Sequence, residues 1–328
     1  MSDGRKVRAL SLLSGGLDSL LAVKVLEEQG IEVTGLTFTS PFFGAENARR
    51  GAGQLGIDLV VVDITDEHLE LVKNPPHGYG KQMNPCIDCH ALMVRRAGEM
   101  MMRDGFDFIA TGEVLGERPM SQNMQSLGTV ARDSRFGEYL LRPLSAKLLP
   151  PTKPELEGKV DRDRLLAIEG RSRKPQMALA KMYGITSYMQ PAGGCLLTDP
   201  AFSARLKDLL KHDPSVTPRQ IGLLRMGRHF RFASGAKAIV GRDEKDNGRI
   251  ELAACGEDCL VVSDITPGPV VLLVFPYSDA DVEAAAALCA SFADNRGEAV
   301  DLEIRLPAGR RRTMAKPSAR SDFDSMRI

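Results

Sequence analysis

The stretch Ser14-Gly15-Gly16-Leu17-Asp18-Ser19 constrains this chain most, because it joins an apolar run (residues 7–13) to a helical pattern (residues 20–29). A glycine-rich turn leading into a helix is an anion site, since its backbone N–H groups lack intrahelical partners and the helix dipole adds positive charge. Asp18 beside a bound di- or triphosphate makes sense if it holds Mg²⁺ there. An ordinary Ser/Gly turn would explain S-G-G alone, but the full pattern in this context is far rarer.

The pattern S-G-G-x-D-S resembles the PP-loop of the ATP pyrophosphatase superfamily, whose members activate a carbonyl oxygen as an adenylate. The resemblance implies that Ser14, Gly15, Gly16, Asp18 and Ser19 bind Mg²⁺ and the β- and γ-phosphates of ATP. The Walker motif G-x-x-x-x-G-K-[ST] does not occur in the sequence. Residues 51–56 match G-x-G-x-x-G, but they follow a helical run and precede a strand, the reverse of a dinucleotide site. We interpret them as a helix end capped by Gly56.

Apolar strand-like runs alternate with helical patterns in the first half of the chain. The strands are expected at 9–13, 33–38, 59–63 and 106–110, and the helices at 20–29, 45–55 and 91–104. This alternation predicts an α/β fold with a doubly wound parallel sheet, whose ligands bind at the carboxyl ends of the strands. Residues 38–40, Thr111 and Gly112 would then share one cleft with the phosphate turn.

The character of the sequence changes in the last third. Residues 162–183 read as helical. After residue 214 come short strands at 237–240, 259–262 and 270–275, then one alanine-rich helix at 280–293 and a last alternating strand at 300–306. This order predicts a second, smaller α+β domain. We therefore expect domains at 1–214 and 215–328.

Composition adds few constraints. The chain of 328 residues has a formal net charge of zero, so only clustering of Lys and Arg can indicate nucleic-acid binding. Such clusters lie at 171–174, 225–231 and 310–312, although each alone is typical of a solvated face. Without a long apolar run we expect a soluble, cytoplasmic protein with no membrane partner. Its six cysteines are then expected to be thiols, redox groups or metal ligands.

Three cysteines have informative surroundings. Cys86 and Cys89 precede the helix expected at 91–104, where thiol pKa values are typically lowered, and Cys195 follows two glycines. Three thiolates can hold a 4Fe-4S cluster with one iron left open. A zinc site would need a fourth ligand, for which the adjacent His90 is poorly placed, and a C-x-x-C redox pair would need no third cysteine. An inert, buried Cys195 is a further alternative, and we interpret the other cysteines, Cys255, Cys259 and Cys289, as structural.

Residues 110–117, 121–124 and 141–144 resemble the block A-T-G-E-x-L-G, S-Q and L-R-P-L of tRNA 4-thiouridine synthetases. With the PP-loop and Cys195, this similarity covers residues 5–210. It implies that ATP adenylates a uridine carbonyl of tRNA and that sulfur then displaces AMP. The Cys86/Cys89 pair resembles the cluster-dependent branch of tRNA thiolation enzymes, which argues against a rhodanese-type partner.

The tail offers a substitute for the ferredoxin-like and THUMP region by which the best-known synthetases bind tRNA. Residues 238–247, residues 267–271, the alanine-rich helix and the last strand resemble the RNA-binding module of NFACT proteins. The basic residues Arg225, Arg228, Arg231, Lys237 and Arg242 then predict a surface that follows RNA phosphates. A purely structural module is the alternative.

The resemblances together imply ATP-dependent tRNA thiolation, most specifically synthesis of 4-thiouridine. Asp18, Cys86, Cys89 and Cys195 are the expected catalytic residues, and Thr111 and Gly112 join the PP-loop at ATP. The expected cofactors are ATP, Mg²⁺ and a 4Fe-4S cluster held by the three cysteines; without a cluster, Cys195 would carry a persulfide. The expected partners are tRNA and a sulfur donor, either inorganic sulfide or a cysteine desulfurase, with a homodimer allowed for. Alternatives are a tRNA 2-thiouridylase, an RNA-binding adaptor without activity, and sulfur insertion into a small metabolite.

Overall fold

The computed structural model describes residues 5–189, 194–213, 215–263, 265–294 and 297–328. The chain forms two compact units, Met1–Thr198 and Asp199–Ile328. The boundary expected at residue 214 therefore differs from this division by one helix, α8 (Pro200–His212). Within the second unit, Asp208 of α8 forms ion pairs with Arg231 and Lys237, which explains why the helix belongs there.

The first unit is built on a parallel sheet with the order β3-β2-β1-β4-β5. Its strands are β1 (Arg8–Leu12), β2 (Glu32–Thr39), β3 (Leu59–Asp63), β4 (Phe108–Thr111) and β5 (Leu140–Leu141). The chain runs outward from β1 to β3 and then crosses back to β4 on the other side of β1. The carboxyl ends of β1 and β4 thus flank the topological switch point, where doubly wound sheets bind ligands.

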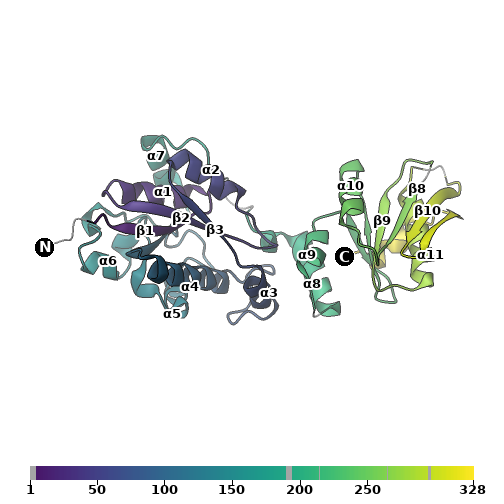
Figure 1. The fold of residues 1–328 in the computed structure, drawn as a ribbon, viewed down its shortest axis with the longest axis horizontal. Coiled ribbons are helices and arrows are strands. Elements are labelled where there is room, and N and C mark those ends of the chain that lie inside the picture. Colours follow the sequence, from purple (N-terminus) through teal and green to yellow (C-terminus); the bar gives the residue numbers. More distant parts are fainter. Residues whose placement is uncertain (1–4, 190–193, 214, 264, 295–296) are drawn as a thin grey trace. The chain divides into compact units, whose positions relative to one another are not determined.

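Helices cover both faces of this sheet (Figure 1). They are α1 (Leu17–Glu27), α2 (Glu46–Leu55), α3 (Thr65–Lys73), α4 (Cys86–Asp104), α5 (Met124–Ser134), α6 (Lys153–Leu156) and α7 (Lys174–Met182). One apolar core joins α1, α2 and α7 to the sheet, and another joins α4 and α5 to its opposite face. The predicted doubly wound parallel sheet is confirmed.

Local structure matches the expectations in most places and departs from them in three. Gly56 ends α2 with a left-handed φ of 71°, so the match to G-x-G-x-x-G is indeed a helix end. Helix α1 begins at Leu17 and α4 at Cys86, earlier than expected, which places Cys86 and Cys89 inside the first turn of α4. The helix expected over 162–183 is wrong for its first part, because residues 166–170 run extended and hydrogen-bond with the segments around Leu115 and Pro143. Short 3₁₀ turns complete the unit at Gly137–Tyr139, Ala146–Leu148, Arg162–Arg164 and Leu196–Thr198.

The second unit contains an antiparallel sheet with the order β11-β10-β8-β9-β7-β6. Its strands are β6 (Arg228–Arg231), β7 (Lys237–Val240), β8 (Cys259–Ser263), β9 (Val270–Val274), β10 (Val300–Leu306) and β11 (Gly309–Ala315). Its helices are α8, α9 (Pro218–Leu223), α10 (Glu244–Ala253), α11 (Asp279–Phe292) and the 3₁₀ turn η5 (Arg320–Met326). Helix α11 packs on one face and α9 with α10 on the other, as the predicted α+β domain requires.

Among the described residues, no helix combines the length and apolar character needed to cross a membrane.

A candidate nucleotide site beside three cysteines

The phosphate turn follows β1 and leads directly into α1. The Ser14 and Ser19 hydroxyls stabilise the backbone of the turn: Gly16 N donates to Ser14 Oγ (3.2 Å), and Ser19 Oγ donates to Gly16 O (2.8 Å). Gly15 has a φ of 76°, and a Cβ there would collide with the backbone carbonyl of Asn47 in α2. In the described chain no side chain caps the amino end of α1, so its first N–H groups remain available to an anion.

The turn after β4 completes the site. Leu12 of β1 lies opposite Thr111 of β4, so both strands end at the same level. Gly112 packs against the backbone between Asp18 and Ser19, where a Cβ would lie 2.5 Å from Ser19 N. The structure therefore brings together the seven residues expected at ATP, namely Ser14, Gly15, Gly16, Asp18, Ser19, Thr111 and Gly112. Their role in ATP binding stays a prediction.

The Asp18 carboxylate is only partly compensated from within the protein. Its Oδ1 is buried and has no hydrogen-bond partner among the described residues. Burial raises the pKa of Asp18, although the nearby Arg173 acts in the opposite direction. Burial and the Asp18 charge also raise the pKa of Glu117. Asp18 and Glu117 are two neighbouring carboxylates with raised pKa values, and one of their oxygens is unpaired. Such a pair fits a divalent cation such as Mg²⁺, whose positive charge would compensate both carboxylates.

Helix α7 contributes residues that sequence reasoning did not assign to this site. Arg173, which precedes α7, and Gln176, in its first turn, both act on the Asp18 carboxylate. Gln176 is fully buried, and apart from its interaction with Asp18 its side-chain amide has no partner among the described residues; Arg173 Nε is likewise buried without a hydrogen-bond partner there. Such buried orphan groups are rare unless a ligand satisfies them. The only sequence signal was the basic cluster at 171–174, interpreted there as a solvated face.

A buried charge network supports the turn after β4. Glu113 Oε2 accepts hydrogen bonds from Arg142 Nε (2.8 Å) and Thr111 Oγ1 (3.1 Å), and Glu113 Oε1 pairs with His90 Nδ1 (2.8 Å). Burial alone would raise the pKa of Glu113, but Arg142 and His90 hold it well below its usual value. Glu113 and Arg142 belong to the A-T-G-E and L-R-P-L blocks, where sequence reasoning gave them no role. Their pairing links the nucleotide turn to His90, the neighbour of Cys89.

The three expected cysteines also gather at this edge of the sheet. Cys86 and Cys89 lie one turn apart in α4, and both Cys86 and Cys195 add to the negative potential at the Cys89 sulfur. Leu196, next to Cys195, donates its N–H to the carbonyl of Phe42, just beyond the end of β2 (3.1 Å). Residues 190–193, which include two residues of the glycine stretch before Cys195, lie outside the described residues.

The expectation of a lowered thiol pKa at the start of this helix is wrong for Cys89. Burial raises the pKa of Cys195 to about 11, and it raises that of Cys89 further. Desolvation of the thiolate outweighs the helix dipole at Cys89. Deprotonation of these thiols therefore needs a compensating positive charge.

His68 contacts Cys89, and the sequence did not suggest this contact. Its ring is fully buried against Phe42 and Phe43, with Nδ1 3.0 Å from Ser40 Oγ and Nε2 2.8 Å from Cys89 Sγ. Burial lowers the pKa of His68 to about 4. His68 lies in α3, far from the cysteines in sequence, so neither motif nor spacing indicated this contact.

The chemistry of the three thiols fits a cluster, whereas their side-chain positions would have to change to bind one. The described residues contain no group of three or more His, Cys, Asp or Glu side chains arranged to hold a metal ion. All three cysteines are free thiols within electrostatic range of one another, and the Cys89 sulfur contacts His68.

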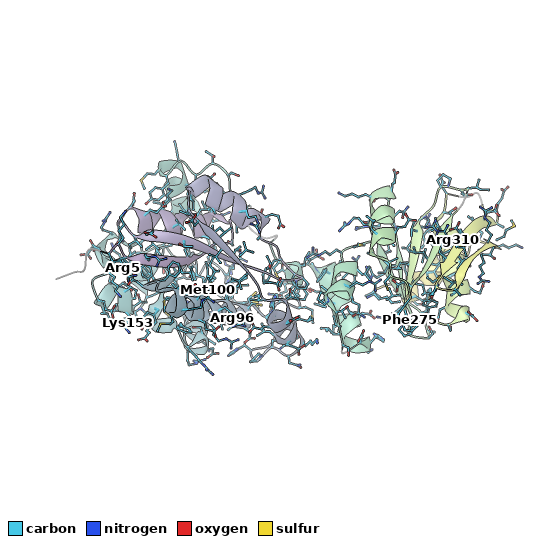
Figure 2. The ribbon with its side chains drawn as sticks, in the orientation of Figure 1. Arg5, Arg96, Met100, Lys153, Phe275 and Arg310 are labelled. Atoms are coloured by element: carbon cyan, nitrogen blue, oxygen red, sulfur yellow. The ribbon has the colours of Figure 1, made fainter. Side chains whose placement is uncertain are left out.

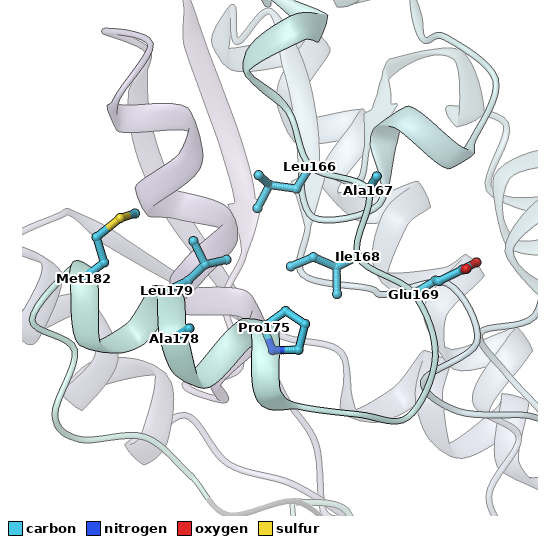
Figure 3. Close-up of a pocket in the computed structure, with 8 residues that line it drawn as sticks. All are labelled: Leu166, Ala167, Ile168, Glu169, Pro175, Ala178, Leu179 and Met182. Carbon is cyan, nitrogen blue, oxygen red and sulfur yellow. The ribbon is translucent and has the colours of Figure 1, made fainter.

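A surface pocket of about 600 Å³ lies between α7 and the extended segment at 166–169 (Figure 3). Leu166 and Ile168 from the extended segment face Pro175 and Leu179 of α7 across it. Glu169 is the one charged residue in its lining. An apolar recess of this kind offers no phosphate ligands, so we assign the nucleotide to the turns after β1 and β4.

The predicted basic surface of the second unit is only partly present. Lys237 is buried, and it pairs together with Arg231 on Asp208 of α8. These two cations are neutralised inside the unit and cannot follow RNA phosphates, which corrects that part of the expectation. Arg228 and Arg242 remain at the surface or half-buried.

Comparison with known proteins agrees with both halves of this description. Residues 4–147 match the family of the thiamine biosynthesis protein (ThiI), and residues 227–325 match the NFACT protein RNA binding domain. Both resemblances are thus confirmed: that of the first unit to PP-loop tRNA thiolation enzymes, and that of the second unit to the NFACT-type module.

Among curated relatives, the tRNA-specific 2-thiouridylase MnmA of Treponema denticola is 34% identical over 122 residues, which cover 32% of this chain and 33% of the relative. The same enzyme of Methylobacterium nodulans is 29% identical over 160 residues, 43% of this chain and 42% of the relative. The chain thus spans about a third to two fifths of these relatives. Among solved structures, a 4-thiouridine synthetase–RNA complex with bound ATP matches with a TM-score of 0.38 and 21% identity, over 55% of this chain and 52% of that one.

Proposed function

We propose that this protein is an ATP-dependent tRNA sulfurtransferase that replaces a uridine carbonyl oxygen with sulfur, most specifically O4. The observation that carries the proposal is the unpaired Asp18 Oδ1 in the PP-loop: the Asp18 backbone lies against Gly112, and the next residue, Glu113, bonds to His90 in the cysteine-bearing first turn of α4. The ThiI and NFACT matches support the substrate class. The L-R-P-L block favours 4-thiouridine, and the MnmA relatives keep 2-thiouridine as the second candidate.

The proposed reaction has two displacements. The uracil carbonyl oxygen attacks the α-phosphorus of ATP, and the bond to the β-phosphate oxygen breaks to release pyrophosphate. Backbone N–H groups at the start of α1 would bind the departing phosphates, and Arg173, whose charge acts on Asp18, would add positive charge beside them. Asp18 and Glu117 would hold Mg²⁺, which neutralises charge on pyrophosphate when bound.

In the second displacement a sulfur nucleophile at the oxidation level of sulfide attacks the activated carbon. The carbon–oxygen bond breaks and AMP leaves with the former carbonyl oxygen, so no external oxidant or reductant is needed. Cys86, Cys89 and Cys195 would hold a 4Fe-4S cluster, which supplies an iron with an open position for a sulfur ligand. Without a cluster, Cys195 would carry a persulfide and one of the pair would resolve it, leaving a disulfide for an external thiol to reduce. The sulfur donor, a homodimer and a cytoplasmic location stay predictions.

Mass spectrometry of tRNA nucleosides from a deletion strain tests this proposal. We expect one thiolated uridine to be lost and to return with the wild-type gene but not with Asp18→Asn. Loss of 2-thiouridine would select the second candidate. An unchanged nucleoside profile would contradict both.

A further inference from the structure

The second unit carries five arginines that gather from separate elements, and among the described residues only Arg242 of the five forms an ion pair, with Asp246. Arg205 lies in α8, Arg228 begins β6, Arg242 follows β7, and Arg320 and Arg327 belong to the carboxyl-terminal segment. Arg228 Nη1 donates to the carbonyl of Gly241, next to Arg242 (3.2 Å). An antiparallel bridge pairs Arg327 with Phe230, two residues from Arg228. These contacts bring Arg228, Arg242 and Arg327 together, although they lie up to 99 positions apart in the chain.

Phe292, the last residue of α11, organises two of these side chains. The guanidinium carbons of Arg228 and Arg320 lie 5.4 and 4.9 Å from its ring centre. Arg320 Nε also donates to the carbonyl of Ser291 (3.1 Å). The aromatic ring thus fixes two like charges beside each other before any ligand binds.

The cluster has more positive charge than its surroundings compensate. Burial lowers the pKa of Arg228, and repulsion from Arg327, Arg320 and Arg242 lowers it further. Burial likewise lowers the pKa of Arg205, with added repulsion from Arg242 and Arg327. The carboxylates that act on Arg205 are Asp199, which caps α8, and Asp246, which is paired with Arg242. Arg205 Nε is buried without a partner among the described residues.

We propose that Arg205, Arg228, Arg242, Arg320 and Arg327 form the site at which this unit binds the backbone phosphates of RNA. Guanidinium groups bind phosphate oxygens in a planar fork, and several of them on one surface match the repeating phosphates of a polynucleotide. Other cations of the unit are used internally: Arg231 and Lys237 on Asp208, and Arg311 on Glu283. This inference rests on the proposed function for its choice of RNA as the polyanion.

The test compares two charge-matched double variants of the full chain in binding to a tRNA transcript without ATP. Arg320→Gln/Arg327→Gln removes two exposed members of the cluster. Arg310→Gln/Arg312→Gln removes two arginines from β11, where Arg310 lies among exposed side chains (Figure 2). We expect the cluster variant to lower the slope of log affinity against log salt by about 1 to 2 and to weaken binding roughly tenfold near 150 mM salt. The β11 variant should change neither, and melting curves verify that both fold.

Wild-type binding and slope in the cluster variant would overturn the inference, as would loss of binding confined to the β11 variant. Equally efficient displacement of tRNA by polyglutamate at the same charge concentration would assign the surface to an acidic protein and would also overturn it. Nucleoside analysis is independent of these outcomes. Thiolated tRNA with normal binding by the cluster variant contradicts this inference alone, whereas a changed slope without any thiolated nucleoside contradicts the proposed function alone.

Discussion

Gly112 lies so close to Asp18 that a Cβ on residue 112 would come within 2.5 Å of the Asp18 carbonyl carbon. The turn after β4 therefore fixes the position of the turn that starts α1. We expect Gly112→Ala to displace the Asp18 backbone and to weaken ATP binding at least tenfold, measured by calorimetry. Gly128→Ala in α5 is the matched control, because a Cβ there meets nothing within 4 Å. Equal ATP affinity in the two variants would show that the contact does not position the nucleotide.

Asp18→Asn should abolish pyrophosphate release in the presence of tRNA, because the cation loses its carboxylate. Asp63→Asn is the control, since Asp63 also ends a strand of the sheet but bonds to Thr39 and Thr65 instead. A coupled pyrophosphate assay, with AMP followed in parallel, measures both. Formation of ADP and phosphate by the wild type would contradict the adenylation mechanism.

The cluster proposal predicts that protein purified without oxygen is brown and contains about four irons per chain, which aerobic isolation removes. Cys195→Ala should lose the iron and thiolation but retain ATP binding. Cys255→Ala, at an exposed thiol of the second unit, should retain all three. Iron analysis and absorbance measure the outcome, and stoichiometric zinc without iron would contradict the cluster.

Breaking the buried Glu113–Arg142 pair should destabilise the protein more than removing both charges. Arg142→Met leaves the buried Glu113 carboxylate without its guanidinium partner, with His90 remaining, and should cost about 3–5 kcal/mol in urea unfolding. Glu113→Gln/Arg142→Met should recover much of this loss. Since the folded-state pKa of Glu113 lies below its usual 4.5, the pair stabilises the fold above that pH, and this contribution is lost as pH falls below it. Glu113→Gln should therefore flatten the acid dependence, and an unchanged acid limb would argue against the pair.

Lys237→Met should stabilise the second unit by up to about 3 kcal/mol near pH 7, because it removes a buried ammonium while Arg231 still pairs with Asp208. Burial lowers the pKa of Lys237 from 10.5 to about 8. Between those values the unfolded chain binds the proton and the folded chain does not, so wild-type stability should rise with pH relative to the variant. Lys245→Met, at an exposed position of α10, should show neither effect in urea unfolding.

The sequence by itself determined the sheet, the phosphate turn and the helix end at Gly56, because these depend on local patterns. Apolar alternation set the order of strands and helices, and the glycines of the turn are required by its backbone geometry. The sequence also indicated which thiols to consider, since Cys86 and Cys89 stand three residues apart just before a helical pattern.

Only the tertiary structure decided how those groups behave. His68 meets Cys89, Gln176 faces Asp18, and Asp208 neutralises Arg231 and Lys237, each through contacts between elements distant in the chain. Burial then raises the Cys89 pKa where local helix chemistry predicted the reverse. Charge compensation and desolvation depend on which groups share a space, and that is set by packing rather than by sequence spacing.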